Sequence, residues 1–219
     1  MNIFEQVGLP PDWGHWFVFE SNRIDPDVGD NTPSSPSFRL HLAALRDTVA
    51  AALSDRFALP RELHRALLPG HPAAGVLRTE TRIIGQRSAF CSLRLPYFMW
   101  RWNADAREQI SAARMRETAL VDRRQCLWGL HYELMNIRPF ELFNGRVGRL
   151  LLVNHSILLG LEPEVLYFEE RDAYLEAIRT HSSRDWGSTP LYKPSAVRYG
   201  EWYEAQAPGA ELDQDPKSD

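Results

Sequence analysis

Two apolar-patterned segments joined by a short proline-containing loop constrain the fold of this chain of 219 residues more than any other feature. Along residues 116–137 apolar side chains recur every three or four positions, which is the spacing of one helix face. Pro139 ends this helix, because a proline pushes the preceding residue out of helical geometry. Residues 145–160 are apolar on most sides, which is typical of a central, buried helix. The sequence therefore predicts a helical core whose two main helices are joined by residues 138–144.

The remaining segments extend this pattern, with one exception. Residues 74–86 combine β-branched residues with glycines at both ends and lack helical spacing, which predicts a short β-hairpin. The expected fold class is therefore all-α with one small β-hairpin. Further helices are predicted over residues 37–57, 61–68, from 96 onward and over 167–181.

Three parts of the chain differ in composition. Residues 1–37 contain an aromatic-rich stretch followed by several prolines and are predicted to form an irregular but ordered arm. Residues 38–182 are predicted to form the helical domain. Residues 183–219 form a C-terminal extension whose polar, acidic end is expected to be disordered.

Composition excludes several classes of function. The formal net charge is −4 and the isoelectric point is about 6.0, whereas nucleic-acid-binding domains are usually strongly basic. No apolar run approaches the ~18 residues of a membrane span, and the first residues lack the pattern of a secretory signal. Cys91 and Cys126 provide neither a disulfide framework nor a zinc site. We expect a cytoplasmic protein that binds neither nucleic acid nor membrane.

The start of the helix at residue 145 has an unusual charge pattern. Asn144 is a suitable N-cap, and Gly145 permits a tight turn. Arg146 and Arg149 share one face of the first turn, where the helix dipole disfavours each cation by ~0.3–1 kcal/mol. A bound anion that accepts from the free backbone N–H groups would offset this cost.

A purely structural reading of these arginines stays open. Arg138, Arg146 and Arg149 could instead pair with carboxylates of the protein, for example Glu133 or Glu141, and bind no ligand. Spacing alone does not decide between the two readings.

The loop resembles the signature of Fic/Doc (Fido) proteins, H-P-F-x-[D/E]-G-N-G-R-x-x-R, which lies between two helices. Further elements are similar to that family and occur in its order, over about residues 16–180. These are an N-terminal S-x-x-x-E inhibitory segment at 21–25, the helix before the flap at 63–68, the flap hairpin at 75–85 and the approach to the motif at 131–134.

The resemblance implies AMP transfer from ATP to a hydroxyl group of a target protein. In the family the motif histidine is the base, the acidic residue holds Mg²⁺, and the glycine-rich turn and arginines bind the phosphates. The flap adds a partner or target peptide as an extra strand. The residues that match are Asn144, Gly145, Arg146 and Arg149 for the phosphates, Arg78, Thr79, Ile83 and Ile84 for the flap, and Ser21 and Asp25 for inhibition, with Asp25 expected to pair with Arg149.

Three neighbouring positions depart from the family pattern. Arg138 replaces the histidine and cannot act as a base, because its pKa exceeds ~12. Leu142 replaces the acidic residue and cannot ligate Mg²⁺. Phe143 replaces the first glycine and adds bulk where phosphate must approach the backbone. Glu141 is an alternative ligand one position earlier, but no metal site is predicted, and ATP or another nucleotide is the expected ligand.

No other histidine is expected to replace the missing base. His131 lies ~10 Å before Arg138 along its helix and is interpreted as a structural residue, as is His155. His64 and His71 flank the flap, and nothing in the sequence brings them to the site.

Three functions stay open at this stage. The first is a bacterial Fic-fold pseudoenzyme or regulator that binds a nucleotide phosphate and docks a protein partner on the flap. The second is an active nucleotidyl- or phosphoryl-transferase with altered chemistry, in which Arg138 stabilises developing phosphate charge, since phosphoryl transfer relies mainly on positioning and electrostatics. The third is a non-catalytic scaffold that binds a protein partner.

Overall fold

The computed structural model describes most of the chain up to residue 183. Of the C-terminal extension predicted over residues 183–219, residues 184–219 lie outside this part. The described residues are 2–25, 31–80, 83–84, 87–88, 91–115 and 119–183.

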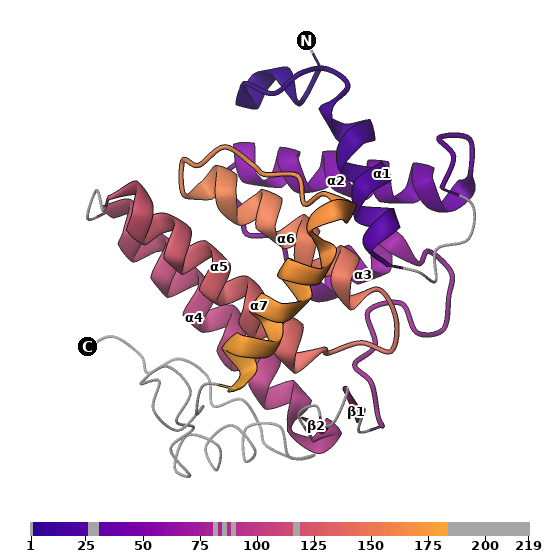
Figure 1. The fold of residues 1–219 in the computed structure, drawn as a ribbon, viewed down its shortest axis with the longest axis vertical. Coiled ribbons are helices and arrows are strands. Elements are labelled where there is room, and N and C mark those ends of the chain that lie inside the picture. The colour runs from indigo at the N-terminus through magenta and orange to yellow at the C-terminus, as the bar shows by residue number, and fades with distance from the viewer. Residues whose placement is uncertain are drawn as a thin grey trace, which may run out of the picture. The chain divides into compact units, whose positions relative to one another are not determined.

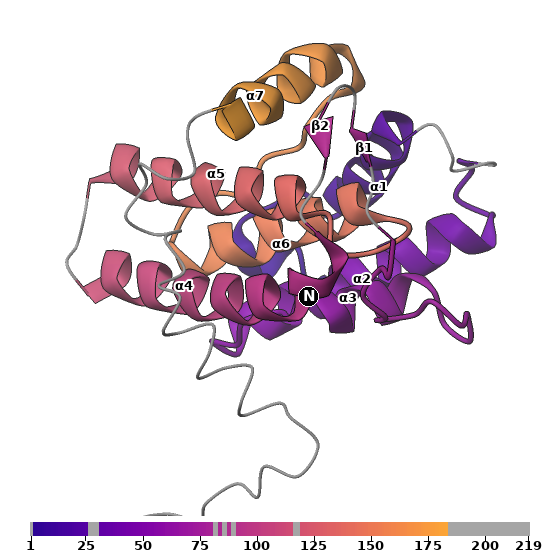
Figure 2. The ribbon, with the colours of Figure 1, turned by 90° about the horizontal axis from the view of Figure 1, so that it is seen from below.

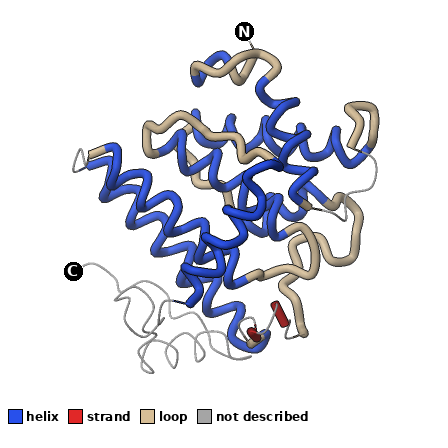
Figure 3. The backbone as a smooth tube through the Cα atoms, in the orientation of Figure 1, coloured by secondary structure: helices blue, strands red, loops and turns tan. Residues whose placement is uncertain are grey.

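Helices dominate the described residues (Figures 1 and 3). None of them is both long enough and apolar enough to cross a lipid bilayer. The α-helices are α1 (Trp13–Ile24), α2 (Pro36–Leu53), α3 (Pro60–Leu67), α4 (Leu95–Met115), α5 (Leu120–Ile137), α6 (Asn144–Leu158) and α7 (Arg171–Ser183). Short 3-10 helices are η1 (Glu5–Val7), η3 (Ser92–Arg94) and η4 (Phe168–Glu170), and the strands are β1 (Ile83–Ile84) and β2 (Arg87–Ser88).

Local sequence signals explain where several helices begin and end. The Ser35 hydroxyl accepts a hydrogen bond from the Phe38 N–H at the start of α2, which is N-capping. Pro60 occupies the first turn of α3, where its missing N–H costs nothing. The predicted end of α5 before Pro139 is confirmed, because the helix stops at Ile137.

The helix α6 lies at the centre of the described fold. It packs against α2, α3 and α5, and Figure 2 shows it between α5 and the α2–α3 pair. Its buried polar side chain Asn154 accepts from the Ala58 N–H and donates to the Thr48 and Arg56 carbonyls. The expectation of a central, buried helix is confirmed.

The prediction of irregular structure over residues 1–37 is wrong for α1. Trp13, Phe17 and Ile24 are buried on one side of this helix, and the Phe17 ring contacts the His41 ring of α2. These apolar positions follow a helical spacing, which the surrounding prolines and polar residues obscured in the sequence.

The small hairpin is present, but later in the chain than predicted. β1 and β2 pair antiparallel, with Ile83 opposite Ser88 and Ile84 opposite Arg87. Residues 76–79 form no strand, because Arg78 is buried and its backbone N–H donates to the Pro139 carbonyl at 2.9 Å. This contact to the α5–α6 loop replaces the strand pairing that its β-branched neighbours suggested.

Two glycines test the close packing of α5 on α6. A Cβ atom added to Gly148 would lie 2.6 Å from the Met135 sulfur, whereas one added to Gly129 would meet nothing within 4 Å. We expect Gly148→Ala to lower the free energy of unfolding by ~1–3 kcal/mol through overpacking. Gly129→Ala is the matched control and raises it by up to ~1 kcal/mol, because alanine favours helix. Urea titration measures both; equal stabilities for the two variants would contradict this packing.

Candidate functional site

The loop between α5 and α6 is held by a side chain of its own helix. The Phe140 N–H donates to Asn144 Oδ1 at 2.9 Å, and Asn144 Nδ2 donates to the Phe140 carbonyl at 2.7 Å. The prediction that Asn144 is the N-cap is wrong, because Phe143 occupies that position and Asn144 is the first helical residue. Asn144 therefore fixes the shape of the loop.

Phe143 adopts a backbone conformation that glycine favours. Its φ of 59° is left-handed, a region that costs an ordinary L-residue ~1–2 kcal/mol. Its ring lies 4.1 Å from the Arg146 guanidinium, and this cation–π contact offsets part of the strain. The chain thus turns in a left-handed conformation at Phe143, and the aromatic ring of this residue covers the Arg146 guanidinium.

Arg78, in the segment between α3 and β1, holds the same loop and lies outside the two strands. Its Nε donates to the Arg138 carbonyl at 2.8 Å, and its Nη2 donates to the Ile137 carbonyl at 3.4 Å. A cation at these carbonyls also complements the negative end of the α5 dipole. Of the other predicted flap residues, Thr79 is exposed, and Ile83 and Ile84 form β1.

His64 contacts the loop, so the expectation that nothing brings it to the site is wrong. Its Nδ1 accepts from the Gly75 N–H at 2.9 Å, and its Nε2 donates to the Leu142 carbonyl at 3.1 Å. Its ring stacks on Phe140 with centroids 4.0 Å apart. Burial lowers the pKa of His64 to about 4, so the ring is neutral and both nitrogens are engaged. No local pattern in the sequence signals this long-range contact.

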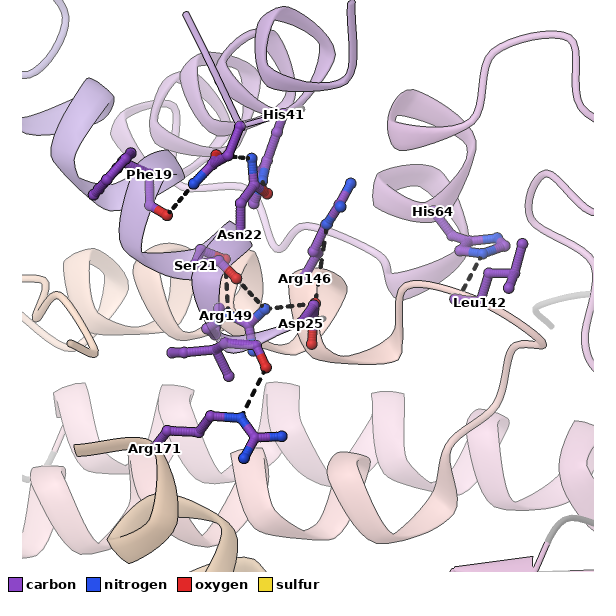
Figure 4. A network of polar contacts seen from close by, with 12 residues as sticks. Phe19, Ser21, Asn22, Asp25, His41, His64, Leu142, Arg146, Arg149 and Arg171 are labelled. Carbon is purple, nitrogen blue, oxygen red and sulfur yellow. Dashed lines mark hydrogen bonds and ion pairs between the residues drawn. The ribbon is translucent and has the colours of Figure 1, made fainter. Parts of the chain in front are cut away.

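The two arginines at the start of α6 meet the end of α1 (Figure 4). Arg149 Nη2 donates to Asp25 Oδ2 at 2.7 Å, so the predicted pair is present. Arg149 also donates through Nε to the Ser21 hydroxyl at 2.7 Å and through Nη2 to the Ser21 carbonyl at 2.8 Å. Arg146 Nε lies 3.9 Å from Asp25 Oδ2. Asp25 thus forms ion pairs with both guanidiniums.

Gly145 makes room for this carboxylate. A Cβ atom at Gly145 would lie 2.7 Å from Asp25 Oδ1 and 2.9 Å from Arg149 Nη1. Asp25 therefore occupies the position over the first turn of α6 where backbone N–H groups and the helix dipole favour an anion. The glycine is needed for close approach of a negatively charged group.

Positive charge exceeds negative charge in this cluster. Arg146 and Arg149 are 1% and 2% exposed, and among the described residues one carboxylate, that of Asp25, forms ion pairs with them. The Arg146 Nε atom is buried and has no hydrogen-bond partner within the described residues. Burial, with a smaller contribution from Arg149, lowers the pKa of Arg146 to about 10 despite the attraction of Asp25. The cluster is thus suited to a further anionic oxygen.

Neighbouring histidines position the helices around the cluster. His41 is fully buried, and its Nδ1 donates to Asn22 Oδ1 at 2.9 Å, which ties α2 to α1. Burial, Arg146 and Arg149 lower its pKa well below the ordinary value. His131 Nδ1 donates to the Gly148 carbonyl, and its Nε2 accepts from the Tyr174 hydroxyl. The interpretation of His131 as structural agrees with these contacts.

The three positions that depart from the Fic signature lie in the described loop. Arg138 follows α5 in a left-handed conformation with φ of 43°, and the Leu142 side chain is 42% exposed. No group of three histidine, cysteine or acidic side chains that could hold a metal ion occurs within the described residues. Of the three side chains at these positions, Arg138 is the charged one, and a guanidinium donates hydrogen bonds but does not accept a proton at neutral pH.

Comparison with known proteins supports the fold. No protein-family model and no curated protein matches the sequence. A Fic-domain-containing signaling protein from Bacteroides thetaiotaomicron is similar in structure, with a TM-score of 0.61 and 19% identity over 81% of this chain and 78% of that chain. Fic-1 from C. elegans has a TM-score of 0.57 and 16% identity over 84% of this chain.

A single-substitution variant of the same C. elegans protein has a TM-score of 0.51 and 18% identity over 80% of this chain. This chain spans 59% and 57% of the two C. elegans chains. The chain therefore has a Fic-type fold.

The buried histidines predict an acid-sensitive fold. Burial lowers the pKa of His64 and His155 to about 4 and that of His131 to about 3, below the 6.5 of an unfolded chain. The unfolded state then binds more protons, so stability is full above pH 6.5 and falls as the pH decreases toward 4. We expect each such histidine to lower the free energy of unfolding by up to ~2 kcal/mol at pH 5.

Urea titrations at pH 7.5, 6.5 and 5.0 measure this dependence. His15→Gln is the control, because His15 is exposed on α1, and it should leave the slope unchanged. A free energy of unfolding that does not decrease between pH 6.5 and 5.0 would contradict the neutral, buried histidines.

Proposed function

We propose that this chain is a Fic-fold pseudoenzyme that binds the phosphate of ATP or another nucleotide at the start of α6 and does not catalyse AMP transfer. The observation that carries the proposal is the pair of buried arginines at the positive end of a helix, which in the described part of the chain pair with one carboxylate, that of Asp25. A phosphate group bears more negative charge and more acceptor oxygens than this carboxylate.

The geometry at Gly145 supports a phosphate at the position of Asp25. Asp25 Oδ1 lies only 2.7 Å from the position that a Cβ of residue 145 would occupy. The Asp25 oxygens therefore lie close to the first turn of α6, where phosphate oxygens would accept from Arg149 and the first-turn N–H groups. The Arg146 Nε atom, which forms no hydrogen bond within the described residues, offers one more donor. Because Asp25 ends α1 and its side chain is 29% exposed, it can yield to a competing anion, and Ser21 continues to hold Arg149.

The substitutions in the loop argue against transfer. In the resembling family a bound nucleotide supplies the transferred AMP, and this requires a base and a metal ligand. Arg138 stays protonated at neutral pH, and Leu142 has no side-chain oxygen for Mg²⁺. The remaining residues bind and orient an anion. The β1–β2 hairpin, as in the family, is proposed to dock a protein partner by strand addition.

Calorimetry with ATP and AMP, with and without Mg²⁺, tests the phosphate site. We expect Asp25→Asn to strengthen binding about tenfold, ~1.4 kcal/mol, because it removes the charge of the internal competitor. Gly145→Ala should abolish binding, because its Cβ fills the site, whereas Gly129→Ala, also a helical glycine, should leave it unchanged. If neither the wild type nor Asp25→Asn binds either nucleotide, the chain is a scaffold without a phosphate site.

Incubation with labelled ATP and cell lysate tests the loss of transfer. We expect no labelled protein from the wild type or from Asp25→Ala. The combined variant Arg138→His, Leu142→Glu, Phe143→Gly and Asp25→Ala should gain transfer, because it restores the base, the acid and the open turn. Label transferred by the wild type would overturn the pseudoenzyme assignment in favour of a transferase with altered chemistry.

A further inference from the structure

A cavity of about 750 Å³ lies outside the arginine cluster described above. It is lined by the segment that leads into α1, by the first turns of α1 and α5, and by the connection from α6 to η4. In Figure 1 this connection passes beside α1. The polar and aromatic side chains that line the cavity are Asp12, Trp13, Trp16, Arg124, Glu162, Glu164, Tyr167 and Glu170.

Negative charge exceeds positive charge in this cavity. Its described lining has four carboxylates and one cation, Arg124, whose Nη2 lies 3.6 Å from Glu164 Oε1. Within the described part of the chain, Asp12, Glu162 and Glu170 form no ion pair. A cation entering the cavity would reduce the repulsion among these like charges and would pair with them.

Exposed aromatic rings form part of the same lining. Trp16 is 56% exposed and Tyr167 is 50% exposed, so both large rings are accessible from solvent. The face of such a ring attracts a guanidinium or ammonium group. Carboxylates and ring faces together are the chemistry that recognises a basic side chain.

The chain itself contains an arginine bound in this way on α1, the helix whose first turn lines the cavity. Arg23 lies 4.6 Å from the Phe168 ring centroid and 5.6 Å from that of Phe19. It also forms ion pairs with Glu20 at 3.0 Å and Glu169 at 3.2 Å. Two rings and two carboxylates, from α1 and η4, thus hold one guanidinium.

The cavity has rings and carboxylates at neighbouring positions of the same elements, α1 and η4. Trp16 precedes Phe19 by three positions and Arg23 by seven, so all three lie along one face of α1. Tyr167 and Glu170 adjoin Phe168 and Glu169 in the sequence. The cavity therefore has aromatic rings and carboxylates, the same kinds of side chain that hold Arg23, and its volume accommodates several side chains.

We propose that this cavity binds an arginine-containing basic segment of a partner protein. Arginine suits the cavity better than lysine, because a planar guanidinium stacks on a ring while it donates two hydrogen bonds to a carboxylate. The negative lining disfavours nucleic acids and other anions. This surface is separate from the phosphate site, and neither proposal depends on the other.

Fluorescence anisotropy with a labelled peptide of alternating glycine and arginine tests the proposal on the full chain. A peptide with citrulline in place of arginine keeps the shape and removes the charge. We expect at least tenfold tighter binding of the arginine peptide. Glu162→Gln combined with Glu170→Gln should weaken it at least tenfold, and Tyr167→Leu about fivefold.

A matched control separates this cavity from the general negative charge of the chain. Asp47→Asn combined with Glu108→Gln removes the same charge from exposed positions on α2 and α4, and it should change the affinity less than twofold. Equal weakening by both double variants, or no binding of the arginine peptide at low salt, would overturn the proposal. Self-association of the chain that is abolished by Glu162→Gln combined with Glu170→Gln would also overturn the proposal, because a second copy of the chain would then occupy the cavity.

Discussion

The burial of Arg146 and Arg149 against the positive end of α6 is the constraint on which the site depends. Removing a charge from water costs several kcal/mol unless it is paired and hydrogen-bonded, and the helix dipole adds to this cost. Asp25 and Ser21 of α1 supply the pairing, so α1 must lie against α6. The contacts of His41 with Asn22, and of Arg171 Nε with the Ile24 carbonyl at 3.2 Å, hold α1 in that place.

Local patterns predicted the elements of the fold more accurately than the contacts within the site. Apolar spacing and Pro139 located α5 and α6, because both signals act over a few residues. The contact between His64 and the Leu142 carbonyl spans 78 positions and leaves no such pattern. The Asp25–Arg149 pair was predicted only through the resemblance of both segments to a known motif. The N-cap was misassigned because Asn144 bonds back to Phe140 instead of capping the helix.

The fold is retained although three residues of the signature are changed. Phe143 adopts a left-handed backbone conformation, which glycine adopts more readily than other residues. Structural similarity at 16–19% identity therefore says little about chemistry, since function depends on the side chains at the site.

The hydrogen bonds that hold the α5–α6 loop have a consequence for ligand affinity. Asn144, His64 and Arg78 hold the loop by hydrogen bonds that involve no ligand. When a loop becomes ordered only on binding a ligand, the lost conformational entropy weakens the binding. Here that entropy is already lost during folding, so selectivity among anions would follow from their charge and shape and not from the flexibility of the receptor.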